Sequence, residues 1–499
     1  MTAPEQRPAV SRRRENALLF AVVGDAPGPA WDGATWAVLD WDYLARAAER
    51  QGIVPLLQAW LARRRTIAVP PAVGAQLYNA YWTNHFRNRI LLQELADILR
   101  AAAAGGVAVM PLKGAVLAPC YYATPALRPM SDLDLLVRPA DAEALAALLR
   151  GRGYAEPPDR PHVLDAPARD PLRRERAFVA ERGGTPVLVE YRTEPLDPAI
   201  WQLTELDPTL TAILDRHAER MWSRGRCATL AEAPFVRPAP EDLLLHVASH
   251  LTTRHHDFRL LWLHDIAAIV AAHADAFDWD SFARATRALG LAAPVFAALE
   301  AAQRWLGAPL PLRRLQRALF GTIPGALAPL QAIERGLLTR RVRALDAADL
   351  AAEPPPDRWL KMAGLLRLRG PRPWLRALRW TLAPSRTYMR GWRGAPAAGG
   401  NAGYAAALAL RLGLIGLRVL AVASRRLGLS ALSARTERLV AWIHRATGLR
   451  PFAADATAPD NNRGTSGTST DGGPAVPHDP RETPGPAQTA GRRGNEDRE

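Results

Sequence analysis

The chain has 499 residues, of which 48% are hydrophobic and 23% are charged, a composition typical of globular proteins. This length exceeds the usual size of one hydrophobic core, so two to four domains are expected. The two cysteines, Cys120 and Cys227, are too few for a disulfide framework and fit no zinc-site spacing. We therefore exclude a disulfide-stapled secreted domain and expect a cytoplasmic protein.

The formal net charge of +15 comes from one segment. Residues 358–450 contain 18 Lys and Arg residues against a single acidic residue, Glu437, which gives a local balance of +17. The remainder of the chain is close to neutral. The basicity therefore belongs to a C-terminal module and is not a general property of the surface.

The N-terminal part is predicted to be helical after a short polar start. Residues 1–14 are polar and expected to be disordered. Apolar residues recur at helical spacing over residues 15–104. The last of these helices is expected over Ile90–Ala104, because Gly105 and Gly106 then supply a C-terminal cap signal.

Residues 105–206 carry the strand signals and are predicted to form a small mixed α/β core. In chain order we expect a strand, a short helix, a strand, a second helix and a hairpin that turns at two glycines. These segments are Val107–Leu112, Ala115–Tyr122, Met130–Val137, Ala140–Arg150 and Ala177–Arg192.

The rest of the chain is predicted to be helical, then basic and helical, and finally disordered. The three segments are residues 207–350, 351–450 and 451–499. The last is rich in Pro, Gly, Ser and Thr and cannot bury a core. The expected fold class is α+β, with a small mixed sheet embedded in a largely helical chain.

The strongest chemical signal is a pair of acids, Asp132 and Asp134, that alternate with apolar residues on the predicted strand Met130–Val137. Alternate residues of a strand point to the same face, so the two carboxylates would lie roughly 7 Å apart on one face. Two such carboxylates can bind divalent cations, and the ligands are hard oxygens, which favours Mg²⁺ over zinc. The pair is therefore a candidate metal site for phosphoryl or nucleotidyl transfer.

Upstream residues supply a candidate phosphate site. Lys113 and Gly114 stand between a predicted strand and a short helix, whose N-terminal N–H groups could face phosphate. Gly114 permits close backbone approach, and Lys113 could offset phosphate charge. Arg128 could clamp phosphate with its fork of donors, and Ser131 directly precedes the acid pair. We predict phosphate or nucleotide binding by these four residues.

This order of motifs resembles the bacterial family of uncharacterised nucleotidyltransferases, within the DNA polymerase beta-like superfamily. The similarity rests on Leu112–Gly114, Tyr122, Arg128 and the strand Asp132–Val137, and more weakly on helical segments such as Pro240–His250. It extends over about residues 15–390. The resemblance implies that two Mg²⁺ ions on Asp132 and Asp134 hold a nucleoside triphosphate while an acceptor hydroxyl attacks the α-phosphorus and pyrophosphate leaves. The acceptor stays open among sugar, antibiotic, peptide, protein and an RNA 3′ end.

One position departs from the family pattern. The family often has an acid and then a histidine two residues later on the third strand, whereas this chain has Leu188 and Glu190 there. Two hypotheses follow. Either Glu190 serves as third metal ligand or general base, or the site lacks its third acid and the chain is a catalytically weak or inactive nucleotide-binding scaffold.

Two other features allow several interpretations. His246 and His250 lie four apart on a predicted helix, and packing, substrate contact and metal binding are all possible. In the basic module, the apolar stretch Tyr404–Ser424 carries arginines every seven residues. It could pack on the protein, lie on an anionic membrane surface, or bind RNA through residues 358–450.

Overall fold

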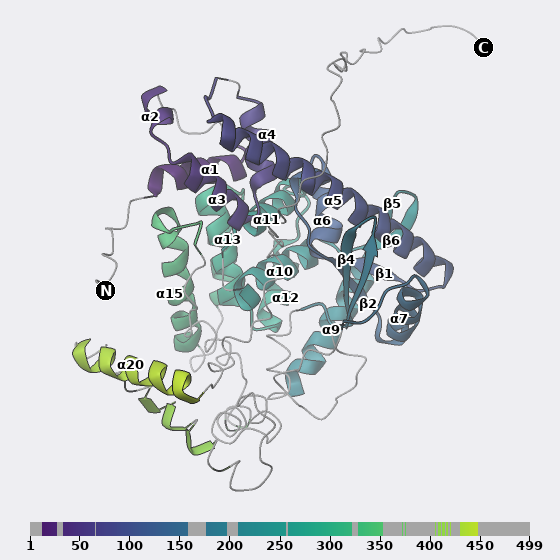
Figure 1. Cartoon of the computed structure of the whole chain (residues 1–499). Coiled ribbons are helices and arrows are strands. Elements are labelled where there is room, and N and C mark those ends of the chain that lie inside the picture. Colours follow the sequence, from purple (N-terminus) through teal and green to yellow (C-terminus); the bar gives the residue numbers. More distant parts are fainter. Residues whose placement is uncertain are drawn as a thin grey trace. The chain divides into compact units, whose positions relative to one another are not determined.

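The computed structural model describes most of the chain through residue 352 and one helix beyond it (Figure 1). The described ranges are 12–26, 33–64, 66–157, 176–196, 208–255, 258–321, 328–352 and 430–447, with scattered positions between 372 and 420. The small mixed sheet within a largely helical chain confirms the α+β fold class.

Four strands form the mixed sheet in the order β1-β2-β4-β3. Their bounds are β1 Val109–Pro111, β2 Leu133–Val137, β3 Arg176–Arg182 and β4 Thr185–Arg192. Strands β1 and β2 are antiparallel, β2 and β4 are parallel, and β3 and β4 form the predicted hairpin through Gly183 and Gly184. All three strand segments predicted in this core are confirmed, although β1 starts two residues later and ends one residue earlier than predicted and β2 starts three residues later.

The alternation of the strands explains how the sheet is buried. In β2, Leu133, Leu135 and Val137 share one face and are fully buried in the main core. Val189 and Tyr191 of β4 bury the same side, since Leu133 and Leu135 are their register partners. The opposite face carries Asp134 and its register partner Glu190, together with Leu136, which is buried in a second apolar cluster with Met110 and Trp222.

Helices precede, interrupt and follow the sheet. The N-terminal set is α1 Arg13–Val23, α2 Gly33–Ala37, α3 Trp41–Gln51, α4 Val54–Ala62 and α5 Pro71–Ala104. Within the core lie α6 Lys113–Tyr121, η1 Pro125–Leu127, η2 Pro139–Asp141 and α7 Ala142–Gly151. The later set is α9 Pro208–Arg224, α10 Pro240–His250, η4 Leu251–His255, α11 Leu260–Ala272, α12 Trp279–Ala288, α13 Ala292–Leu306, α14 Leu312–Phe320, α15 Ala328–Ala344, η5 Leu345–Ala347 and α20 Ser430–Thr447.

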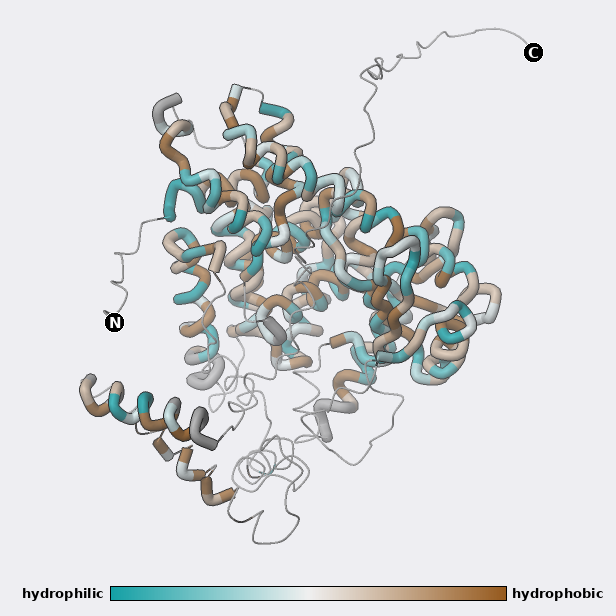
Figure 2. Tube along the Cα trace, in the orientation of Figure 1, coloured by the Kyte–Doolittle hydropathy of each residue, from teal (hydrophilic) through white to brown (hydrophobic). Residues whose placement is uncertain are grey.

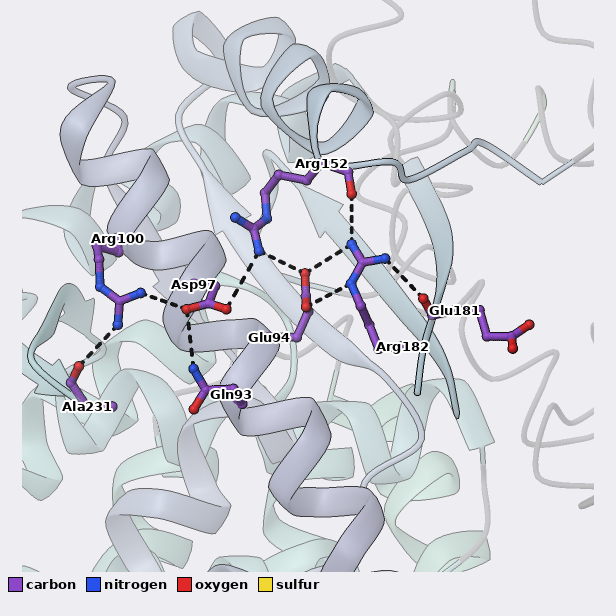
Figure 3. Close-up of polar contacts among 8 residues, drawn as sticks. All are labelled: Gln93, Glu94, Asp97, Arg100, Arg152, Glu181, Arg182 and Ala231. Atoms are coloured by element: carbon purple, nitrogen blue, oxygen red, sulfur yellow. Dashed lines mark hydrogen bonds and ion pairs between the residues drawn. The ribbon is translucent and has the colours of Figure 1, made fainter. Parts of the chain in front are cut away.

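The long helix α5 is tied to the sheet by a cluster of ions around Glu94 (Figure 3). Arg182 of β3 donates to Glu94 at 2.9 Å, and Arg152 from the end of α7 donates at 3.1 Å. Burial alone would raise the pKa of Glu94, but these two arginines outweigh it and lower the pKa. The Glu94 cluster therefore joins three elements that are far apart in the sequence.

A second hairpin, β5 Arg226–Leu230 and β6 Ala233–Arg237, lies where helices alone were predicted. Its two-residue turn has positive φ at both Ala231 (45°) and Glu232 (66°). Such turns normally carry Asn or Gly. The sequence therefore lacked the usual hairpin signal.

Several predictions concern residues outside the described part of the chain. These are the disorder of residues 1–11 and 451–499 and most of the basic helical module, including about half of its apolar stretch. Of that module, α20 is described, and Figure 2 shows hydrophobic and hydrophilic residues alternating along it. Among the described residues, no helix is both long and apolar enough to cross a membrane.

Candidate functional site

The two acids of the central motif lie at the start of β2. Asp134 is inside the strand and almost fully buried, with 2% of its surface exposed. Asp132 directly precedes β2, is partly buried, and accepts a hydrogen bond from Ser131 Oγ at 3.1 Å. The prediction that both acids lie within the strand is therefore right for Asp134 and wrong for Asp132, which lies in the segment that leads into β2.

Two cations from opposite sides hold Asp134. Lys113 Nζ lies 2.9 Å from Asp134 Oδ1, and a guanidinium nitrogen of Arg192 lies 3.2 Å from the same oxygen. Lys113 begins α6 with a φ of 46°, an unusual value for a lysine that marks a sharp turn out of β1. Arg192 ends β4 and was not singled out in the sequence. The signal that could have identified Arg192 is its position two residues after Glu190, which places both side chains on the same face of β4.

The two carboxylates differ in their affinity for a proton. Burial and repulsion from Asp134 raise the pKa of Asp132 to about 6. Burial would also raise the pKa of Asp134, but the charges of Lys113 and Arg192 outweigh it and lower the pKa. One acid is therefore already compensated by the protein's own cations, while the other retains affinity for an added positive charge.

Glu190 shares the face of the pair. It is the register partner of Asp134 on the parallel strand β4, so their side chains leave the sheet on the same side. Within the ranges that the structure covers, however, no three His, Cys, Asp or Glu side chains are grouped so that they could hold a metal ion. The role of Glu190 as third ligand stays a prediction.

Arg128 makes contacts that the sequence did not reveal. Its guanidinium forms a two-pronged ion pair with Asp265 of α11, at 2.8 and 3.2 Å, and donates to the Pro129 carbonyl at 2.7 Å. The Tyr122 hydroxyl donates to the same carboxylate at 2.6 Å. Arg128 and Asp265 are 7% and 1% exposed. Asp265 is thus a residue of the site region that the sequence did not identify.

This ion pair fixes the loop that leads into the acid pair. Asn88 of α5 donates to the carbonyls of Pro125 and Arg128, at 2.8 and 2.7 Å. A Cβ on Gly114 would lie 2.9 Å from a guanidinium nitrogen of Arg128 and 2.8 Å from Met130 Cγ. A larger residue at 114 would therefore force Arg128 and Met130 to shift, whether or not phosphate also approaches there.

The two histidines of α10 differ in their relation to the site. The charge of His250 contributes to lowering the pKa of Asp134. His246 is fully buried, and its Nδ1 lies next to the Pro195 carbonyl. The packing interpretation therefore fits His246, whereas His250 is close enough to influence the acid pair.

Comparison with protein families matches residues 38–307, just over half of the chain, to the family described as Uncharacterised nucleotidyltransferase. No curated protein and no solved structure gives a significant match. The matched range contains β1, α6 and β2, the three elements that carry Lys113, Gly114 and the acid pair. The chain belongs to the uncharacterised nucleotidyltransferase family.

Proposed function

We propose that this protein transfers a nucleoside monophosphate from a nucleoside triphosphate to a hydroxyl acceptor, with the help of Mg²⁺. The observation that carries the proposal is the contrast within the acid pair, where Asp134 is compensated by Lys113 and Arg192 while the pKa of Asp132 is raised to about 6. A buried like-charge pair is costly for the fold, and such pairs concentrate at sites that bind cations or move protons.

The donor set fits Mg²⁺. This ion is commonly held by one or two carboxylates, and substrate phosphates and water complete its shell. Asp132 and Asp134 provide the two carboxylates, and we propose Glu190 as a third ligand. When bound, Mg²⁺ would neutralise phosphate charge and stabilise the attacking and leaving oxygens.

The residues around the pair are proposed to bind the triphosphate. Lys113, relieved of Asp134 by the bound cation, would turn its ammonium toward phosphate oxygens. The N–H of Gly114 at the start of α6 and the hydroxyl of Ser131 are the proposed further donors. A direct phosphate contact by Arg128 stays a prediction, and its pairing with Asp265 favours a role in holding the loop.

The transfer itself needs a base and an in-line geometry. The acceptor oxygen attacks the α-phosphorus, and the bond to the bridging oxygen breaks as pyrophosphate leaves. We propose that Glu190 accepts the hydroxyl proton, because it lies on the same sheet face as Asp134.

The experiment is incubation of the protein with labelled nucleoside triphosphates and pooled acceptors, from metabolite extract to RNA, with pyrophosphate release as the readout. The proposal expects release by the wild type and none by Asp132→Asn or Asp134→Asn proteins that remain folded. A Glu190→Gln variant should be strongly impaired. If the wild type binds Mg²⁺-nucleotide without turnover over all pools, the protein is instead an inactive nucleotide-binding scaffold.

A second candidate role, membrane attachment, is favoured by α20. Its exposed apolar residues Leu432, Leu439 and Trp442 stand among arginines such as Arg435 and Arg438. This is the composition of a helix that lies in an anionic interface. Co-sedimentation with vesicles that contain anionic lipid should require residues 393–450. Unchanged vesicle binding after their deletion would contradict the role, and binding of RNA by that region would replace it.

A further inference from the structure

Helix α5 exposes a row of aromatic side chains, which we call the α5 stripe: Tyr78, Trp82 and Phe86. They follow one another at intervals of four residues, so they lie on one face of the helix over about 12 Å. Their exposed fractions are 53%, 38% and 55%. The ring centroids of Tyr78 and Trp82 are 6.1 Å apart, and those of Trp82 and Phe86 are 5.9 Å apart, which makes a continuous aromatic surface.

The charges on this part of α5 are all of one sign. The sequence from Pro71 to Gln93 contains no Asp or Glu, whereas Arg87 and Arg89 follow the stripe directly. Arg89 is exposed and lies three residues after Phe86, on the stripe's side of the helix. An aromatic surface that is bordered by Arg89 and free of acids in its own segment complements a ligand that has both flat rings and negative charge.

The same segment of α5 reaches the candidate active site. Asn84 donates to the Ala126 carbonyl at 2.7 Å, and Asn88 donates to that of Arg128. Arg87 donates to the carbonyl of Ser131, the residue before Asp132, at 3.3 Å. These three side chains lie on the opposite side of α5 from the stripe, so the stripe shares a helix, but not a face, with the contacts to the loop that leads into the acid pair.

We propose that the α5 stripe is a docking surface for single-stranded nucleic acid, on which successive bases stack while Arg89 contacts phosphate. Base stacking on aromatic rings tolerates any sequence, and the length of the stripe suits two or three bases. A strand docked on the stripe would pass around α5 before its terminal hydroxyl reaches Asp132. That last step, in which the nucleic acid is the acceptor, rests on the proposed nucleotidyl transfer, whereas the docking does not.

The test measures binding without turnover. A fluorescein-labelled 12-nucleotide single-stranded RNA is titrated with the full chain, in the absence of nucleotide, and followed by fluorescence anisotropy. The double variant Trp82→Ala/Phe86→Ala should raise Kd by about tenfold or more for each lost stack. Trp82→Tyr should largely preserve binding. Arg89→Gln should reduce the slope of log Kd against log salt concentration by about one.

Val38→Ala is the matched control, because it removes an exposed apolar side chain (67%) that lies outside both α5 and the basic module. It should leave Kd unchanged. Photo-crosslinking of a 4-thiouridine strand should label the peptide around Trp82. Crosslinks confined to residues 358–450, or equal Kd for the double variant and the wild type, would overturn the proposal.

A different occupant would give a different pattern. If the stripe joins two copies of the chain, the double variant would change the mass measured by light scattering and leave RNA affinity intact, which also overturns the proposal. Stripe-dependent RNA binding without pyrophosphate release from any of the acceptor pools would instead support docking and contradict the proposed function. The two failures are therefore distinguishable.

Discussion

Two of the carboxylates that are buried between basic side chains are Glu94, which lies between Arg152 and Arg182, and Asp134, which lies between Lys113 and Arg192. In both, the cations lower the pKa of the carboxyl group. The difference is Asp132, which stands beside Asp134 and whose pKa is raised to about 6.

This difference separates an ion cluster that supports the fold from one suited to binding. Around Glu94, the carboxylate forms ion pairs with Arg152 and Arg182, and these pairs join α5 to β3 and to the end of α7. At β2, Lys113 and Arg192 neutralise the charge of Asp134. The charge of the nearby Asp132 carboxylate is compensated less, and its ionised form is unfavourable for the folded state. The account therefore expects changes at Glu94 to affect stability, and changes at the acid pair to affect activity.

The largest effect is expected from neutralising either acid of the pair. Asp132→Asn or Asp134→Asn should reduce nucleotidyl transfer by at least about 10²–10³-fold, since each removes charge that stabilises the transition state. The measurement is initial rate of pyrophosphate release. Glu94→Gln is the control and should retain the wild-type rate at a temperature where it is folded.

Breaking the buried pair between Arg128 and Asp265 should give the largest loss of stability. Asp265→Asn leaves the Arg128 guanidinium buried without its counter-charge, and the expected cost is about 3–5 kcal/mol by urea unfolding. Asp280→Asn is the control, because its exposed pair with Arg314 should contribute under about 1 kcal/mol. Equal losses from the two variants would contradict the role given to Asp265.

Asp132→Asn should stabilise the protein above pH 6. The folded pKa of Asp132 is about 6 and the unfolded value about 3.8, so the folded state binds more protons between these values. Wild-type stability should therefore fall as pH rises through this window, and the asparagine variant lacks that fall. The free energy of unfolding of the variant, relative to that of the wild type, should be higher at pH 8 than at pH 4 by about 1–3 kcal/mol. A difference independent of pH would contradict the raised pKa.

The smallest effect should come from Glu94→Gln, with the opposite pH dependence. The pKa of Glu94 is lowered below its ordinary 4.5, so its contribution is present above that pH and is lost as pH falls through the folded value. Thermal unfolding at pH 7 should show a loss of about 1–2 kcal/mol. That loss should shrink in acid. A loss that grows on acidification would break the comparison with Asp132.

The parts of the fold that sequence predicted are those with local signals. Glycines at 105–106 and 183–184 ended α5 and turned the β3–β4 hairpin where expected. The hairpin β5–β6 was missed because Ala231 and Glu232 take positive φ without glycine. Tertiary packing overrides residue preference there, and no local pattern reports it.

In the site, contacts close in sequence were predictable and contacts across the fold were not. Alternation placed Asp134 opposite the core, and the order of motifs joined Lys113 to it. Arg192 and Asp265 could not be assigned, because their contacts depend on the parallel pairing of β2 with β4 and on the packing of α11. Arg128 illustrates the limit, since an arginine before an acid pair reads as a phosphate ligand until its buried carboxylate partner is seen.

The most direct test of the account is metal-dependent nucleotide binding, because it needs no knowledge of the acceptor. Calorimetry would follow binding of a non-hydrolysable α,β-methylene nucleoside triphosphate with and without Mg²⁺, in the wild type, Glu94→Gln and Asp132→Asn/Asp134→Asn. The account predicts Mg²⁺-dependent binding by the first two and its loss in the third. Equal Mg²⁺-dependent affinity in the double asparagine variant would contradict the assignment of the acid pair.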